Sequence, residues 1–257
     1  MPTLARITLF PIKAFDGHAV ERAEVLPSGA LADDRRFALQ DPAGELINGK
    51  KFATVHQIRT RYSDDLQSVS LRGPQGEATF ALEPDNRLLA DWCSEFLNVR
   101  CHLIENTESG FPDDCDSPGP TLISTASLAE VCRWFGTFDL EEARRRFRMN
   151  LEVAAELPFW EDRFVGEQPP PRRFRIGNTT WQGGGICQRC AVPTRSALAG
   201  TVDPGFARQF SQQRQATLPA WSPQQRFDHF YRFGVNTLLD STVADAHVSI
   251  GDVVEPI

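Results

Sequence analysis

Residues 183–190 read GGGICQRC and hold the side chains best suited to chemistry. A structural zinc site would need a second pair of ligands, and the five scattered histidines form no such pair with Cys187 and Cys190. A redox dithiol should open a helix, whereas Pro193 follows this pair closely. Zinc and dithiol chemistry are therefore disfavoured. Two interpretations stay open: a pair of buried thiols, or one thiolate ligand to a metal held mainly by an organic group.

The residues around the two cysteines suit a bulky anionic ligand. Arg189 lies between them, where a guanidinium either lowers the pKa of a neighbouring thiol or holds an anionic group. The glycines at 183–185 have no side chain, so they would let the backbone approach a cofactor closely.

The composition excludes several classes of protein. The chain has 257 residues and a net charge of −7, and an acidic chain is poorly suited to sequence-independent nucleic-acid binding. No apolar run reaches the roughly 18 residues of a membrane helix. The N-terminal stretch has no basic segment followed by a continuous apolar one, as a signal peptide would. We therefore expect a cytoplasmic protein that binds neither nucleic acid nor membrane.

Short strand patterns dominate the chain. Residues 68–82 alternate around Gly-Pro-Gln-Gly and predict a hairpin. Residues 86–97 change to a helical period with Leu88 on the apolar face and Asp85 or Asn86 as the cap. A strand and then a helix are expected over 121–136, with Ser127 and Glu130 as a capping box.

Residues 107–120 consist mainly of Gly, Pro, Asp and Ser, which favours a domain boundary or a long loop. We place two domains at 1–118 and 119–257. Many short strands with few helices indicate a mainly β fold with added helices (α+β), built from barrel-like or sandwich-like sheets.

Seven segments, in order, resemble one family. They are LFPIKAFDG (9–17), DDRRFALQD (33–41), TLISTASLAEV (121–131), RFRMNLEV (146–153), PFWEDRF (158–164), GICQRCAVPT (185–194) and VSIGDVV (248–254). Together they resemble MOSC-domain proteins that carry a MOSC N-terminal β-barrel domain, such as the mitochondrial amidoxime-reducing component and its bacterial relatives. The resemblance covers nearly the whole chain and implies two β-barrel-like domains.

The resemblance also implies a cofactor and a set of residues that hold it. The family binds the molybdenum cofactor, a pyranopterin dithiolene that bears a phosphate. Cys190 matches the cysteine that ligates molybdenum and is the expected catalytic and metal-binding residue, whereas Cys187 is a neighbour. The expected cofactor-binding residues are Lys13, Arg35, Ser124, Thr125, Ser127, Arg148, Asn150 and Arg189. Lysine and arginine suit the phosphate and pterin carbonyls, and Asn or Ser suits the amino edge of the pterin.

Some residues depart from the family pattern or have simpler interpretations. Ala14 and Met149 stand where relatives tend to carry a hydroxyl and a proline, and the sequence after Cys190 also differs. Glu161 and Asp162 suit either acid–base work near a substrate or a network that fixes a loop.

The resemblance implies a molybdenum-cofactor oxidoreductase that reduces N-hydroxylated compounds. Because the sequence has neither a ferredoxin-type cysteine segment nor a Gly-rich dinucleotide motif, we expect electrons from a separate partner protein. The alternative is a sulfur carrier or cofactor-delivery protein that uses a persulfide on Cys190. A non-catalytic β-domain is the third interpretation.

Overall fold

The computed structural model describes residues 1–241 and 243–257. Strands account for 32% of the chain and helices for 22%, which confirms the expected α+β class with more strand than helix. The strands are β1 (Thr3–Leu9), β2 (His18–Val20), β3 (Arg22–Glu24), β4 (Phe37–Gln40), β5 (Arg59–Tyr62), β6 (Ser68–Gly73), β7 (Gly76–Ala81), β8 (His102–Glu105), β9 (Leu122–Ser124), β10 (Leu151–Ala154), β11 (Arg173–Ile176), β12 (Thr179–Gln188), β13 (Arg232–Ser241), β14 (His247–Ser249) and β15 (Val254–Pro256). The α-helices are α1 (Arg87–Leu97), α2 (Thr125–Phe135), α3 (Leu140–Phe147) and α4 (Phe206–Ala216). Short 3-10 helices are η1 (Ala53–Gln57), η2 (Trp160–Phe164), η3 (Val192–Thr194) and η4 (Gln224–Arg226).

The largest sheet joins the two ends of the chain. Its strand order is β15-β11-β12-β13-β9-β10-β1-β2, so β1 and β2 extend a sheet built otherwise from strands beyond residue 121. β1 pairs antiparallel with β10, and β3 pairs with β14. The outer strands β15 and β2 are not paired with each other among the described residues, but the chain at the start of β15 returns to β1, where Thr3 forms an antiparallel bridge with Val253.

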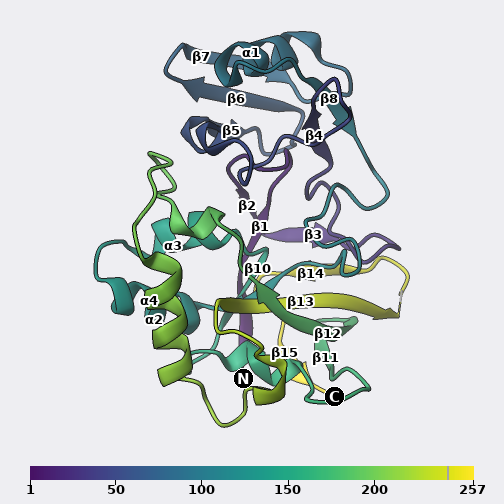
Figure 1. Ribbon diagram of the computed structural model, residues 1–257. Coiled ribbons are helices and arrows are strands. Elements are labelled where there is room, and N and C mark those ends of the chain that lie inside the picture. The colour runs from purple at the N-terminus through teal and green to yellow at the C-terminus, as the bar shows by residue number, and fades with distance from the viewer. Residues whose placement is uncertain (242) are drawn as a thin grey trace.

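Figure 1 shows the strands β4 to β8 and the helix α1 together as a separate upper part. There β4 pairs with β8, and β5, β6 and β7 form a three-stranded sheet. A hydrophobic cluster from Ile12 to Leu103 fills this part. The predicted domain boundary between 118 and 119 stays a prediction. Strands β1 and β2 belong to the large sheet and β3 pairs with β14, so the sheets themselves cross that boundary.

Local signals at the helix ends were partly correct. Asn86 caps α1 by accepting a hydrogen bond from the Leu89 amide at 3.1 Å, as one of the two predicted caps. Leu88, placed on the buried face from the period, is instead 73% exposed. The cap of α2 is Ser124 and not Ser127, because the Ser124 hydroxyl accepts from the Ser127 amide at 3.2 Å.

Helices α2, α3 and α4 lie on one side of the large sheet (Figure 1). They pack through a cluster of aromatic side chains that includes Trp134, Phe147 and Phe210. Across residues 1–241 and 243–257, no helix combines the length and the apolarity that crossing a bilayer requires.

Candidate cofactor site

A cavity of about 400 Å³ lies where the turn after β1, the loop at 107–120, the end of α3 and the end of β12 meet. This volume suits a cofactor-sized ligand. Its wall contains six of the predicted site residues, namely Lys13, Arg35, Arg148, Asn150, Arg189 and Cys190. We call it the cationic cavity. The loop at 107–120 is called the connecting loop below.

The segments that carry Lys13 and Arg35 are held together by backbone hydrogen bonds. The Lys13 amide donates to the Phe37 carbonyl at 2.8 Å, and the Arg35 amide donates to the Phe10 carbonyl at 2.9 Å. The Asp34 carboxylate accepts from the Phe10 amide at 2.8 Å and pairs with the Arg35 guanidinium. Asp34 therefore holds both the turn after β1 and the Arg35 guanidinium.

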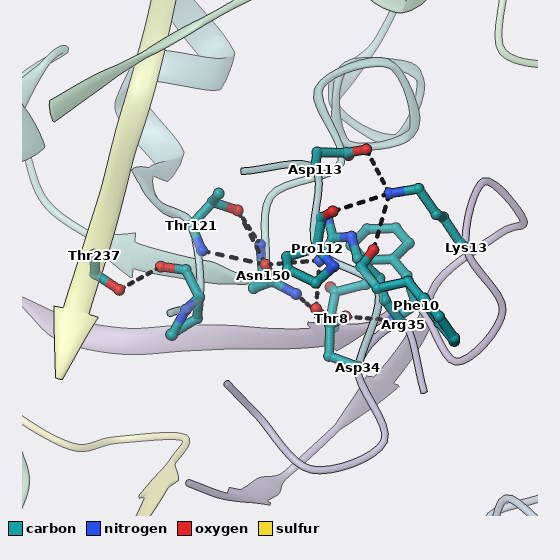
Figure 2. A network of polar contacts seen from close by, with 12 residues as sticks. Thr8, Phe10, Lys13, Asp34, Arg35, Pro112, Asp113, Thr121, Asn150 and Thr237 are labelled. Atoms are coloured by element: carbon teal, nitrogen blue, oxygen red, sulfur yellow. Dashed lines mark hydrogen bonds and ion pairs between the residues drawn. The ribbon is translucent and has the colours of Figure 1, made fainter. Parts of the chain in front are cut away.

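Lys13 is nearly buried, and its ammonium faces the connecting loop (Figure 2). Burial lowers the pKa of Lys13, and the nearby Arg35 and Arg148 lower it further, while Asp113 opposes the shift. For Arg35, burial acts against the charge, but the Asp34 and Asp113 carboxylates outweigh it and raise its pKa.

Arg148 is the C-cap of α3 and adopts a left-handed conformation with φ of 53°. Its guanidinium donates to the Phe15 carbonyl at 2.6 Å and lies 4.2 Å from the centre of the Phe10 ring. Burial and the charge of Arg35 lower its pKa to about 10, so it is still a cation at pH 7. It forms no ion pair with a carboxylate in the part of the chain that the structure describes, so an anion in the cavity would satisfy it.

Three non-glycine residues in the cavity wall have positive φ. They are Ala14, Arg35 and Arg148, with φ of 72°, 51° and 53°. Such conformations cost free energy and persist where the surrounding structure imposes them, often at functional sites. Here they direct two guanidinium groups toward one space.

Asn150 is buried and uses both ends of its amide (Figure 2). Its oxygen accepts from the Thr121 amide at 3.2 Å and from the Arg35 guanidinium at 3.5 Å, and its nitrogen donates to the Thr8 carbonyl at 3.0 Å. Asn150 therefore positions Arg35 and joins β1 to the start of β9.

The two cysteines differ in environment. Cys187 is buried in β12 and donates its thiol to the Asn236 side chain at 2.7 Å. Burial raises the pKa of Cys187 to about 11, and Arg189 offsets only part of this shift. Cys190 follows the strand, is half-buried and faces the cationic cavity. Both cysteines line the cavity, and because Cys187 is buried and donates its thiol to Asn236, Cys190 is the more accessible of the two.

Arg189 is tied to the protein by two contacts. Its guanidinium donates to the Phe147 carbonyl at 2.6 Å and contacts the Met149 sulfur at 3.7 Å, while its buried Nε has no hydrogen-bond partner among the described residues. Met149 in turn fits against Gly234, where a Cβ would lie 1.9 Å from the methionine methyl. The methionine methyl could shift, but the φ of 77° at Gly234 is a backbone conformation that other residues rarely adopt, so the backbone favours glycine there.

Three residues that were predicted to bind the cofactor lie outside the wall of the cationic cavity, and their role at a cofactor stays a prediction. Ser124 and Ser127 are fully buried, and the Ser127 hydroxyl donates to Glu161 at 3.0 Å. The Thr125 hydroxyl donates to Glu152 at 2.7 Å. Because these residues start helix α2, their hydroxyls are used for its cap and for buried carboxylates, and none lines the cationic cavity.

Glu161 and Asp162 also lie outside the cavity wall. Both are buried, and Asp162 pairs with the buried Arg214. Burial and the Asp162 carboxylate raise the pKa of Glu161. Of the two interpretations offered above, the structure supports the network that fixes a loop.

The glycines before the cysteines serve chain packing. A Cβ at Gly183 would lie 2.0 Å from the Phe164 carbonyl oxygen, and one at Gly184 would lie 3.0 Å from the Ser117 hydroxyl. None of the three glycines lines the cationic cavity, and at Gly183 protein atoms already take up the space that a cofactor would need, whereas a Cβ at Gly185 would meet only the Arg226 guanidinium, at 3.8 Å. Their close approach to a cofactor stays a prediction.

Sequence reasoning missed several residues of the cavity wall, including His56, Asp113, Asp114 and Asn236. Burial and the charges of Arg148, Arg195 and Arg59 lower the pKa of His56 to about 4, so its ring is neutral at pH 7. These residues come from separate parts of the chain and belong to no recognisable sequence motif, so no pattern indicated that they would meet at the cavity.

The lowered pKa of His56 predicts a pH-dependent stability. An unfolded histidine, with a pKa near 6.5, binds more protons than the folded one, so the unfolding free energy falls as pH drops from about 6.5 to 4. In His56→Gln we expect this fall to be smaller by on the order of 2 kcal/mol, measured by urea unfolding across that range. His102→Gln, at an exposed strand position, is the control. An unchanged pH dependence in His56→Gln would contradict the assignment.

The donor set fits an anionic, metal-bearing cofactor. Lys13, Arg35 and Arg148 supply positive charge, Arg189 has an unsatisfied buried N–H, and Cys190 supplies one soft ligand in a space of cofactor size. Across the described residues, no group of three or more His, Cys, Asp or Glu side chains is arranged to hold a metal ion. Fold and site thus define a strand-rich α+β protein with a thiol-bearing cationic cavity.

Comparison with known proteins identifies the family. Residues 1–100 match the MOSC N-terminal beta barrel domain, and residues 121–255 match the MOSC domain. The chain belongs to the MOSC domain family, and the expected membership is confirmed. MOSC domains are associated with the molybdenum cofactor.

The curated relatives are distant. The molybdenum cofactor sulfurase of Solanum lycopersicum is 22% identical over 77% of this chain and 30% of its own length. That of Danio rerio is 24% identical over 74% of this chain and 28% of its own length. The chain thus spans less than a third of these relatives. Among solved structures, the YUAD protein from Bacillus subtilis aligns with a TM-score of 0.43 at 11% identity, covering 100% of this chain and 96% of that one.

Proposed function

We propose that this chain binds the molybdenum cofactor in the cationic cavity and reduces N-hydroxylated compounds such as amidoximes, hydroxylamines and N-hydroxylated bases. A separate protein supplies the electrons. The observation that carries the proposal is one cavity that combines cationic side chains, Lys13, Arg35 and Arg148 among them, with a half-buried thiol, and whose wall draws on both matched domains.

Each residue of the wall has a role that its geometry supports. Lys13, Arg35 and Arg148 hold the anionic group, since charge-assisted hydrogen bonds to a phosphate are strong. Asn150 fixes the direction of Arg35 through its amide oxygen. Cys190 is the protein ligand to the metal, and Arg189, held by the Phe147 carbonyl, adds positive charge to the wall beside it.

The cofactor, when bound, supplies two-electron redox chemistry at molybdenum. The protein contributes a fixed set of cations, whose charge favours the anionic ligand, and a wall that limits access of water. The ring of His56 in the wall stays neutral until the pH falls to about 4, because burial and the nearby arginines lower its pKa.

A second function is favoured by two observations. The curated relatives are molybdenum cofactor sulfurases, and the Cys190 thiol is partly accessible from the cavity. A persulfide carried on Cys190, or delivery of the bound cofactor to another protein, would use the same wall. This function needs an accessible, nucleophilic Cys190 and no electron donor.

Metal analysis tests the proposal. The protein, purified from a host that makes the cofactor, should contain close to one molybdenum per chain and should reduce an amidoxime with an artificial electron donor. Molybdenum without reduction would favour delivery. Absence of molybdenum together with a persulfide on Cys190 in intact-mass spectra would favour the sulfur carrier, and absence of both would refute the proposal.

A further inference from the structure

The ammonium of Lys13 is saturated by one stretch of the connecting loop. It donates to the Phe111 carbonyl at 2.9 Å, to the Pro112 carbonyl at 3.3 Å and to the Asp113 carboxylate at 2.7 Å (Figure 2). A lysine ammonium has three N–H groups, so none is left for a ligand. An anion that reaches Lys13 must displace at least one of these acceptors.

Asp113 is the acceptor that is easiest to displace. Its side chain is 62% exposed, whereas that of Lys13 is 8% exposed, so water can solvate the carboxylate once it leaves the ammonium. The carboxylate makes no other hydrogen bond with residues 1–241 or 243–257. Because the arriving anion takes over as the counter-charge of the buried Lys13, the exchange leaves no buried charge unpaired.

Asp113 also carries the same sign of charge as the proposed anionic ligand. Although burial opposes it, the charges of Arg35, Lys13 and Arg148 hold the pKa of Asp113 well below its usual range, so it is an anion at neutral pH. It therefore neutralises part of the charge that would otherwise attract a phosphate.

The connecting loop is fastened on both sides of this residue. The Phe111 amide donates to the Arg35 carbonyl at 2.8 Å. On the other side, Asn236 donates to the Asp114 carboxylate at 2.9 Å, and Thr237 donates to the Pro120 carbonyl at 2.6 Å. The Asp113 carboxylate can thus leave Lys13 by a side-chain rotation, without release of the loop.

We propose that Asp113 is an internal competitor for the anion site: its carboxylate occupies Lys13 in the empty protein and is displaced when the anionic group of the ligand binds. The inference rests on the proposed function for the identity of that ligand. The competition sets the affinity of the site and discriminates against weakly charged anions that cannot displace a carboxylate.

Titration with inorganic phosphate tests this inference without the loaded enzyme. In isothermal titration of cofactor-free protein, Asp113→Asn should bind phosphate roughly fivefold to tenfold more tightly than the wild type, because a neutral amide competes less and repels less. Asp113→Glu keeps a carboxylate and should stay within about twofold of the wild type.

Asp116→Asn is the matched control for charge alone. Asp116 lies on the same loop, is exposed and does not line the cavity, so its substitution should leave phosphate affinity within about twofold of the wild type. Equal gains in Asp113→Asn and Asp116→Asn, or no gain in Asp113→Asn, would overturn the inference. Thermal melts establish that each variant is folded.

The result is separable from that of the proposed function. If the protein never contains molybdenum but Asp113→Asn still binds phosphate more tightly, the competition holds and the ligand is a different phosphorylated molecule. If molybdenum is present and Asp113→Asn shows no gain, the cofactor proposal stands and the competitor is rejected.

Discussion

Cys190→Ser should lose its molybdenum and at least about a hundredfold of its amidoxime reduction, since loss of even an outer-shell partner of a metal site typically costs 10- to 100-fold. Serine offers a hard oxygen that stays protonated at neutral pH, whereas molybdenum in this cofactor suits a soft thiolate. The measurement is metal per chain by plasma mass spectrometry, with the reduction rate recorded on the same sample.

Cys187→Ser is the matched control for this experiment. The Cys187 thiol is buried, its pKa is raised to about 11, and it donates to Asn236, a contact that a serine hydroxyl can also make. We expect this variant to keep its molybdenum. Full metal and full activity in Cys190→Ser, or loss of both in Cys187→Ser alone, would show that the ligand has been misassigned.

Arg214→Ala should lower the free energy of unfolding by about 3–5 kcal/mol, since it leaves the buried Asp162 carboxylate without its counter-ion. Both side chains are 0% exposed, and the Arg214 guanidinium lies 3.8 Å from the centre of the Phe159 ring. Ser222 also donates to Asp162. Removal of the arginine side chain thus leaves the Asp162 carboxylate unpaired, uncovers the face of the Phe159 ring and creates a cavity.

Urea unfolding measures this loss, and Arg173→Ala is its control. Arg173 pairs with Asp240 at the surface and is 53% exposed, so its removal should cost less than about 1 kcal/mol. Replacing both members of the buried pair, as in Arg214→Met with Asp162→Leu, should recover much of the loss, because no buried charge is then left unpaired. An equal loss in Arg214→Ala and Arg173→Ala would contradict this view of the core.

Features set by neighbouring residues were predictable from the sequence. The hairpin of β6 and β7 follows from alternation around a turn, and the cap at Asn86 follows from a side chain that bonds to the amide three residues on. The α2 cap was misplaced because Ser124 and Ser127 both satisfy the local rule. What separates them is Glu161, a residue far along the chain that accepts the Ser127 hydroxyl.

The cavity wall was predictable only where a motif carried it. Lys13, Arg35, Arg148, Asn150 and Cys190 came from the family resemblance and converge in the structure, while their binding to a cofactor stays a prediction. Asp113 lay in a stretch interpreted as a boundary, and its place beside Lys13 depends on contacts about a hundred residues apart. Leu88 was misplaced because the helical periodicity shows which residues share the apolar face of α1. It does not show whether a residue at the edge of that face is covered by the rest of the protein.

The pairing of β1 with β10 has a consequence for how the chain reaches its native state. Thr3 pairs with Ala154, so this edge of β1 waits for a partner about 150 residues later, which at 5–20 residues per second is roughly eight to thirty seconds, although β2 pairs with the other edge much sooner. During that interval an apolar strand edge is unprotected, and closure of so long a loop slows folding. We therefore expect the β10-facing edge of β1 to be a place where a chaperone can bind during synthesis.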